Sequence, residues 1–357
     1  MALLFYLLDK NMELKRIIEN YKSAIWTERY NESGDFELYI PATIDIINAV
    51  NFDTDGATQY IIRADDTSKC GMIESVKITT DAEDGNFLTV SGRTLAALPF
   101  RRVSTSQTTF TGSATKTIER LLYKNLIAPI DNRRQIENMT FKNSVPAATD
   151  QPLTNQYNGD NIGEAIEAIC KTLRIGYRIN FDLENKALEF EIYEGTDRTT
   201  DQSAVPPVIF SNDFNNLLSS DYTVDVTDWK NAAHIMGEGQ GTNRMRVDFG
   251  ILSGIDRREI YVNAQQTSTN GEELTPSTYN GILYDKGYQA VSEKRPKREN
   301  EADVAPNYGF ILNRDYFLGD VVTVRNEYGI EITPRVLEII EAQDENGYSI
   351  IPTFGIE

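Results

Sequence analysis

Residues 71–92 read GMIESVKITTDAEDGNFLTVSG and predict a β-hairpin. Two strand-like runs flank Asp84-Gly85-Asn86, and such residues supply the positive-φ positions that a tight turn requires. A second tight turn is predicted at Asn346-Gly347, between the strand-like runs VLEIIEAQ and YSIIPTFG. We therefore expect strands and hairpins to dominate the chain.

Three further strands are predicted upstream of the first hairpin. Residues 3–8 form an apolar run that we interpret as a buried first strand, because the charged stretch that follows offers no signal-peptide cleavage site. In DFELYI (35–40) the apolar residues alternate on one face. The segment TQYIIRAD (58–65) has the β-branched and aromatic content of a strand.

The clearest helix is predicted at residues 161–173, where apolar residues recur at helical spacing. Asn161 and Glu164 resemble a capping box at its start. A strand, a turn and a second strand follow, which predicts a helix packed on a hairpin. Two more helices are predicted at 113–126 and between positions 276 and about 293.

Two polar stretches, 131–160 and 294–307, are rich in turn residues. We interpret both as surface connections, and the second is a candidate mobile loop. With strands dominant and helices inserted at a few places, the predicted fold class is β-rich α+β.

Composition limits the classes of function. The chain has 357 residues, with 54 acidic against 35 basic side chains and a formal net charge of -19. This balance argues against a nucleic-acid binder and against an anionic membrane surface as a partner. No apolar run approaches the length needed to cross a bilayer. Cys70 and Cys170 indicate neither a disulfide framework nor a zinc site, so we expect folding in a reducing cytoplasm.

Motifs for catalysis are missing. His234 is the only histidine, which excludes multi-histidine metal centres, and its run KNAAHIMGEG predicts a partly buried structural residue in a strand. The glycine-rich residues 237–241 lack the Lys-Ser/Thr of a phosphate-binding loop and are interpreted as a flexible hairpin. No motif selects one carboxylate pair among the many acids. We expect no enzyme activity, no cofactor and no metal site.

Several segments together resemble siphovirus tail-tip proteins, which are related to the baseplate hubs of contractile phages. The resemblance covers nearly the whole chain, in the expected order. The segments that carry it are AIWTERYNESGDFELYIPA (24–42), the stretch 71–103, EIYEGTDRT (191–199), the stretch 206–239 and the stretch 315–355.

The resemblance implies two tube-like antiparallel β-barrel domains with inserted helix–hairpin elements. It also implies a homotrimer, in which six similar barrels form a pseudo-sixfold ring that continues the tail tube. The domains expected on this basis are a first barrel at 1–105, an α/β insert at 106–205, and a second barrel at 206–357 with a helical insert near 275–307.

The same resemblance implies a structural role in the virion. Such hubs close the distal end of the tail tube, bind the distal tail protein and the tape measure protein, and let phage DNA pass without specific binding. Tail fibres or receptor-binding proteins are further candidate partners. Many relatives carry a lytic or receptor-binding extension, whereas the hub-like segments here run to the end of the sequence, so no lytic activity is expected.

One basic turn stands out in this acidic chain. SGRTLAALPFRRV (91–103) places Arg93, Arg101 and Arg102 around a short apolar helix. A phosphate site would need a glycine-rich turn and more basic residues nearby. Arginines at a joint between domains or subunits can instead pair with carboxylates, and we favour this joint over a solvated turn.

Two other functions remain open. A receptor- or carbohydrate-binding adhesin is the second interpretation, favoured if Trp26, Trp229 or the 18 tyrosines form an exposed stacking platform. A cell-wall hydrolase is the third. For the hub, we predict a net acidic lumen supplied by 71–92 and 315–341, because basic side chains there would hold DNA.

Overall fold

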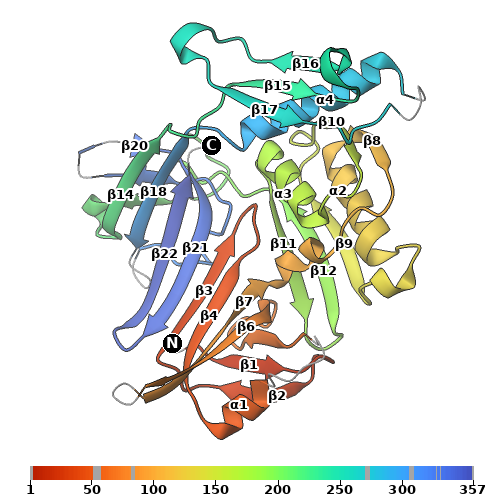
Figure 1. Cartoon of the computed structure of the whole chain (residues 1–357). Helices are drawn as coiled ribbons and strands as arrows, with labels where there is room; N and C mark the ends of the chain where they lie inside the picture. Colours follow the sequence, from red (N-terminus) through yellow and green to blue (C-terminus); the bar gives the residue numbers. More distant parts are fainter. Residues whose placement is uncertain are drawn as a thin grey trace.

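Strands dominate the computed structural model, and helices are few (Figure 1). The structure describes residues 3–50, 58–81, 85–269, 274–304, 309–326, 328–329 and 331–355. The predicted β-rich class is confirmed.

The largest sheet in the described residues has eleven strands, and every neighbouring pair is antiparallel. Four strands from the C-terminal part of the chain join seven from its first part, because β21 pairs with β3. The sheet is therefore shared by both ends of the sequence (Figure 1). Across the sheet the order is β14 (Leu217–Asp225), β18 (Lys297–Val304), β22 (Gly347–Gly355), β21 (Arg335–Asp344), β3 (Ser23–Arg29), β4 (Asp35–Pro41), β7 (Gly85–Thr94), β6 (Cys70–Asp81), β5 (Tyr60–Arg63), β1 (Phe5–Leu8) and β2 (Leu14–Ile18).

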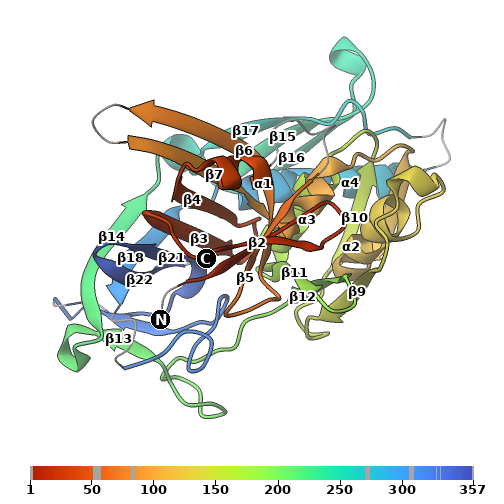
Figure 2. The same ribbon diagram turned by 90° about the horizontal axis from the view of Figure 1, so that it is seen from below.

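Both predicted hairpins are confirmed. In the first, β6 and β7 pair up to Asp81 opposite Gly85, which has a φ of 95°; Asp84 lies outside the described residues. Figure 2 shows this hairpin as a two-stranded arm at one side of the molecule. In the second, β21 and β22 pair up to Asp344 opposite Gly347, with a φ of 124°. The predicted first strand is β1, which is buried between β2 and β5.

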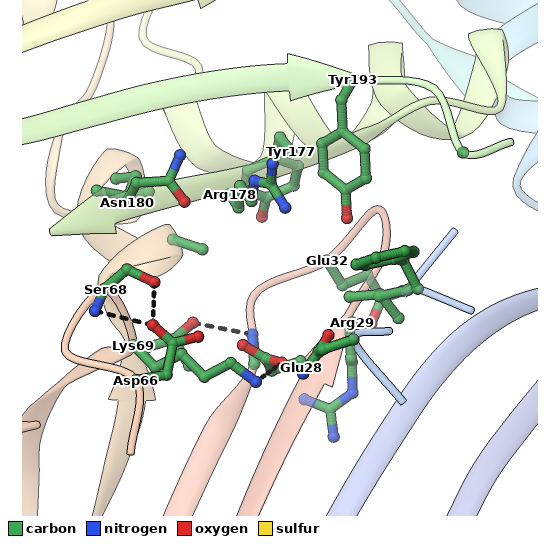
Figure 3. A pocket seen from close by; sticks show the side chains of 18 of the residues that line it. Glu28, Arg29, Glu32, Asp66, Ser68, Lys69, Tyr177, Arg178, Asn180 and Tyr193 are labelled. Carbon is green, nitrogen blue, oxygen red and sulfur yellow. Dashed lines mark hydrogen bonds and ion pairs between the residues drawn. The ribbon is translucent and has the colours of Figure 1, made fainter. Parts of the chain in front are cut away.

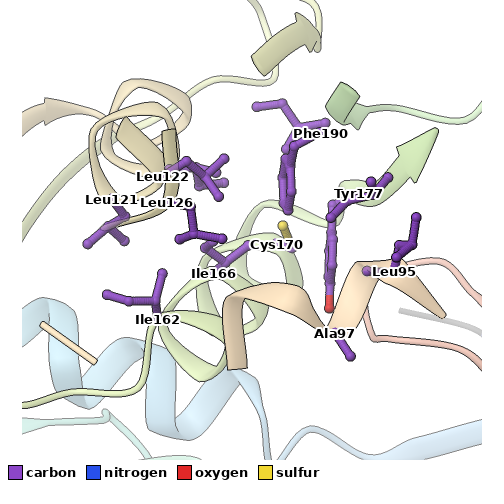
Figure 4. Packing of buried hydrophobic residues seen from close by; sticks show 14 of the residues in the cluster. Leu95, Ala97, Leu121, Leu122, Leu126, Ile162, Ile166, Cys170, Tyr177 and Phe190 are labelled. Carbon is purple, nitrogen blue, oxygen red and sulfur yellow. The ribbon is translucent and has the colours of Figure 1, made fainter. Parts of the chain in front are cut away.

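The predicted helix on a hairpin is also confirmed. The Asn161 side chain accepts hydrogen bonds from the amides of Gly163 and Glu164 and so caps α3 (Ile162–Leu173), which packs on β11 (Gly176–Asp182) and β12 (Ala187–Tyr193). Figure 4 shows the apolar cluster that holds these elements together. The cluster also includes residues of η1 (Leu95–Arg101), α2 (Ala114–Leu122) and η2 (Tyr123–Ile127), and of several neighbouring strands.

The two polar stretches are not merely surface connections, and that interpretation was wrong. The stretch 131–160 contains η3 (Asn132–Arg134), β9 (Met139–Ser144), which pairs in parallel with β12, and β10 (Pro152–Tyr157), which pairs with β8 (Thr108–Ser113). The stretch 294–307 contains β18, paired on both sides with β14 and β22; residues 305–307 lie outside the described residues. Backbone hydrogen bonds to two neighbours hold β18, and side-chain polarity does not report them.

A smaller sheet lies apart from the large one. Its order is β16 (Arg246–Phe249), β15 (Ala232–Met236) and β17 (Glu259–Asn263), and α4 (Pro276–Ser292) packs against it (Figure 1). The remaining elements are α1 (Ile44–Val50), β13 (Ile209–Ser211), η4 (Asn212–Phe214), η5 (Gly241–Asn243), η6 (Gly254–Asp256), β19 (Thr323–Arg325) and β20 (Glu331–Ile332).

Within the described residues the sheets are open, and none closes on itself as a barrel. The large sheet ends at β14 on one side and at β2 on the other. Of the helices in this part of the chain, none is long and apolar enough to cross a membrane.

Candidate functional site

A buried network of charges joins the two ends of the chain. Arg63 Nη2 on β5 donates a hydrogen bond to Glu341 Oε2 on β21 at 2.9 Å, and the exposed fractions of the two side chains are 3% and 4%. Arg63 also pairs with Asp65 at 2.6 Å. Lys69 Nζ lies 2.7 Å from Glu28 on β3 and 3.4 Å from Glu341. The network therefore links the N-terminal strands to a strand near the C-terminus.

The surroundings keep Glu341 ionised despite its burial. Burial alone would raise the pKa of this carboxyl group, but hydrogen bonds from Arg63 and Tyr348 and the charge of Lys69 lower it to about 2. Burial likewise works against the charge on Arg63, while Asp65 and Glu341 raise the pKa of its guanidinium group. Removing one member would leave an uncompensated buried charge.

Tyr30, at the end of β3, is a second link between distant segments. Its amide donates to the carbonyl oxygen of Leu337 at 2.8 Å, and its own carbonyl oxygen accepts from the amide of Tyr177 at 3.0 Å. The Tyr30 hydroxyl accepts from the amide of Gly195 at 3.1 Å. A Cβ at Gly319 would lie 2.3 Å from the Tyr30 ring, so only glycine allows this close approach. Through its backbone, hydroxyl and ring, Tyr30 thus contacts the chain near Leu337, Tyr177, Gly195 and Gly319.

A cavity of about 370 Å³ lies beside these links, between β3, the loop 66–69 and the hairpin β11–β12 (Figure 3). Its charged side chains include several that pair with one another or stack on rings. Lys69 binds Glu28, and the Arg178 guanidinium carbon lies 4.6 Å from the centre of the Tyr193 ring. Such pairing is typical of a structural joint between segments.

Two of the three arginines in the predicted joint share one carboxylate. Arg93 donates from Nε and Nη2 to the two Glu74 oxygens at 2.8 and 2.9 Å, and Arg101 Nη2 lies 3.3 Å from Glu74 Oε1. Arg101 also donates to the Thr58 hydroxyl at 2.9 Å. These contacts hold the basic turn to β6, within the first part of the chain.

Arg102 lies away from Glu74 and contacts η3 (Asn132–Arg134). Its Nε donates to the carbonyl oxygen of Arg134 at 3.2 Å, and its Nη1 donates to that of Arg101 at 3.1 Å. Burial lowers the pKa of Arg102, and the charges of Arg134 and Arg101 lower it further. In the described parts of the chain, no carboxylate pairs with Arg102. Within the described residues, the charge of Arg102 therefore has only carbonyl oxygens as partners.

The network of Arg63, Glu341 and Lys69 was not predicted from the sequence. A signal was present, since Arg63 ends the apolar run YIIR and Glu341 follows the apolar pair in LEIIEA. A charged side chain inside a strand-like apolar run is buried only when it is paired, so each residue implied a partner. Because Arg63 and Glu341 are 278 positions apart, the sequence does not indicate that they pair with each other.

His234 lies on β15, in a strand as predicted. Its ring contacts carboxylates on the two neighbouring strands, β16 and β17. Its Nδ1 is 2.6 Å from Asp248 Oδ1 on β16, and its Nε2 is 3.0 Å from Glu259 Oε1 on β17. These hydrogen bonds raise the pKa of the imidazole. The described residues contain no group of three or more side chains suited to hold a metal ion.

The two tryptophans do not form an exposed platform. Trp26 is fully buried and stacks on Phe36, with ring centres 5.7 Å apart. Trp229 is partly buried, and the Arg258 guanidinium carbon lies 5.1 Å from the centre of its ring. The condition set for the adhesin interpretation is therefore not met by either tryptophan.

Nearly the whole chain matches a known protein family. A family model described as siphovirus ReqiPepy6 Gp37-like protein matches residues 4–356. A search of curated protein sequences gives no match.

Solved structures share the fold at low sequence identity. A tail protein from Neisseria meningitidis MC58 aligns with a TM-score of 0.58 and 13% identity, over 100% of this chain and 97% of that one. A 43 kDa tail protein of prophage MuSo2 from Shewanella oneidensis gives 0.54 and 12%, over 98% and 95%. The prophage tail protein gp18 from Listeria monocytogenes EGD-e gives 0.53 and 12%, over 100% and 95%.

Proposed function

Because the chain belongs to the family of siphovirus ReqiPepy6 Gp37-like proteins, we propose that it is the structural hub of a phage tail tip, which continues and closes the distal end of the tail tube. The observation that carries this proposal is the family match, which extends over residues 4–356. The full-length agreement in fold with three tail proteins, two of which are described as prophage proteins, supports it. The proposed location is the tail tip of the virion, after synthesis in the host cytoplasm.

The proposed assembly is a homotrimer that forms a pseudo-sixfold ring. In the described residues the strand order of the large sheet ends at β14 and at β2, and tube-like closure would come from strands of neighbouring copies. The proposed domains remain 1–105, 106–205 and 206–357. Arg102 supports the subunit joint, because its half-buried positive charge has only carbonyl partners within the described part of its own copy.

The proposed role is mechanical and not enzymatic. A tip that binds the distal tail protein and the tape measure protein, and then lets DNA pass, has to keep its own chain folded while its neighbours move. The buried charges of Arg63 and Glu341 and the packing around Tyr30 tie the two ends of the chain together for this purpose. No catalytic step is assigned to any residue.

Labelling of purified tails tests this role. A peptide tag fused to the chain should direct gold-labelled antibody to the distal end of the tail, and deletion of the gene should leave particles that cannot infect. Label along the tube or on the capsid would contradict the tail-tip role. As a control, a tag on the major tube protein should label the whole length of the tail.

A further inference from the structure

One segment departs from the acidic character of the chain. Residues 93–134 contain eight basic and two acidic side chains, whereas the whole chain has 54 acidic and 35 basic ones. Three of the eight basic side chains pair with a carboxylate. Within the residues that the structure describes, the other five pair with none; they are Arg102, Lys116, Arg120, Lys124 and Arg134.

Three of these five form one row on the surface of α2 and η2. Lys116, Arg120 and Lys124 are exposed and four positions apart, so their side chains fall on one helix face. The Arg120 guanidinium carbon and the Lys124 amine lie 5.3 and 5.6 Å from the centre of the same Phe110 ring. Tyr123, three positions after Arg120, shares this face and is 44% exposed. The three cations, which we call the basic row, span about 12 Å along the helix.

Folding of the chain does not account for the basic row. Like charges four positions apart on a helix destabilise it. In the described parts of the chain the Lys116 side chain has no polar partner, and Lys124 Nζ reaches only the Thr108 hydroxyl, at 3.4 Å. The opposite, buried side of α2 is held by apolar residues of the core cluster. A negatively charged partner would offset the repulsion within the row.

The surroundings of the basic row favour a protein partner over a phosphate polymer. Tyrosine and arginine are enriched at protein interfaces, and Tyr123 lies among the cations. Val103, 49% exposed, lies next to η2, because the Arg134 guanidinium donates to the Val103 carbonyl oxygen and to Asn125. A long phosphate polymer would run beyond the row onto an acidic chain that repels it. An acidic protein segment can end where the row ends.

We propose that the basic row docks an acidic segment of a different protein, whose Asp or Glu side chains face Lys116, Arg120 and Lys124 and whose apolar side chains pack beside Tyr123. The two views of the ribbon show α2 at one side of the molecule and β14 and β18 at the other (Figures 1 and 2). This inference goes beyond the hub function, since it holds for a partner in the tail or in the producing cell.

Zero-length cross-linking with a carbodiimide, which couples lysine amines to carboxylates in contact with them, tests the docking. It is applied to purified tails and to the full chain isolated under native conditions from producing cells. We expect Lys116 and Lys124 to be joined to Asp or Glu residues of one other protein, identified by mass spectrometry of the linked peptides. Links only to carboxylates of this chain, in the same copy or another, would overturn the proposal. Absence of links at both lysines in both preparations would overturn it too.

A charge-reversed double variant separates docking from stability. Lys116→Glu with Lys124→Glu should lower the amount of the linked protein recovered with the chain at least tenfold. Each new glutamate lies four positions from Arg120, so the melting temperature should be no lower than that of wild type. Lys10→Glu with Lys77→Glu makes the same change of charge at exposed lysines outside the segment and is the matched control. Unchanged recovery in the first variant, or equal loss in the control, would contradict docking at the row.

The remaining outcomes separate the basic row from the hub function. If tails carry the chain at their tip but neither lysine is linked to another protein, the row fails and the hub stands. If the links form in cells but tails lack the chain, the hub fails and the row stands. Binding of a fluorescent single-stranded DNA by the purified chain at physiological ionic strength, lost in the Lys116→Glu and Lys124→Glu double variant, would overturn the protein partner in favour of a phosphate polymer.

Discussion

Arg63 and Glu341 lie 278 positions apart in the chain and meet in a buried ion pair, with Arg63 Nη2 2.9 Å from Glu341 Oε2. The pair closes the junction where the C-terminal strands join the N-terminal part of the sheet. Replacing either residue by a neutral one would leave the charge of the other buried without its partner. The stability of the whole sheet therefore depends on this junction.

Glu341→Gln should lower the free energy of unfolding by about 3–5 kcal/mol, because the charge of Arg63 remains buried with fewer partners. The matched control is Glu331→Gln, which breaks the more exposed pair between Arg325 and Glu331. That change should cost at most about 1 kcal/mol. Urea denaturation of both variants measures the difference, and equal losses would contradict a special role for the buried pair.

The lowered pKa of Glu341 predicts how the stability of the folded chain depends on pH. Its pKa is about 2 in the folded chain, against an ordinary value of 4.5. A lowered folded pKa stabilises the protein above the unfolded value, and this contribution is lost as the pH falls from about 4.5 to 2. Thermal denaturation across this window should show a shallower decline for Glu341→Gln than for wild type. Parallel curves would show that Glu341 does not contribute.

Gly319→Ala tests the packing on Tyr30. Gly319 has a φ of 93°, and its new Cβ would meet the Tyr30 ring at 2.3 Å. Gly329→Ala is the matched control, since its φ is 74° and nothing lies within 4 Å of a Cβ. Both variants bear backbone strain, but only the first displaces a ring, so it should lose roughly 1–3 kcal/mol more. Equal melting temperatures would rule out tight packing at this link.

Replacing Arg102 by glutamate should weaken the trimer more than it unfolds one copy, because Arg102, unlike Arg101, has no carboxylate partner in the described residues of its own chain. Reversed charge would repel the carboxylates of a neighbouring subunit, while the local contacts of Arg102 are to carbonyl oxygens. Arg133→Glu, at a highly exposed arginine paired with Asp131, is the control. Sedimentation should report the loss of trimer and circular dichroism the preserved fold. An unchanged trimer mass would argue against the subunit joint.

Local signals in the sequence predicted the local structure well. The turns at Gly85 and Gly347 and the cap at Asn161 depend on neighbouring residues, so each could be recognised from a short stretch. The strand β18 was missed because its polar sequence hides pairing with segments about 50 and 80 positions away.

Long-range relationships could not be read from the sequence. The pairing of β21 with β3, which brings Glu341 to Arg63, depends on segments more than 270 positions apart. The basic turn was recognised from the sequence, but the sequence did not indicate that Arg93 and Arg101 bind the same carboxylate, that of Glu74. Which strands form free edges likewise follows from the complete sheet order.

A cryo-electron microscopy reconstruction of purified tails that contain this chain would show whether it is the hub of the tail tip. We expect three copies in a ring at the distal end of the tube, around a channel whose facing side chains sum to a negative charge. A tip without this chain, or one in which the chain lies outside the ring, would rule out the hub function.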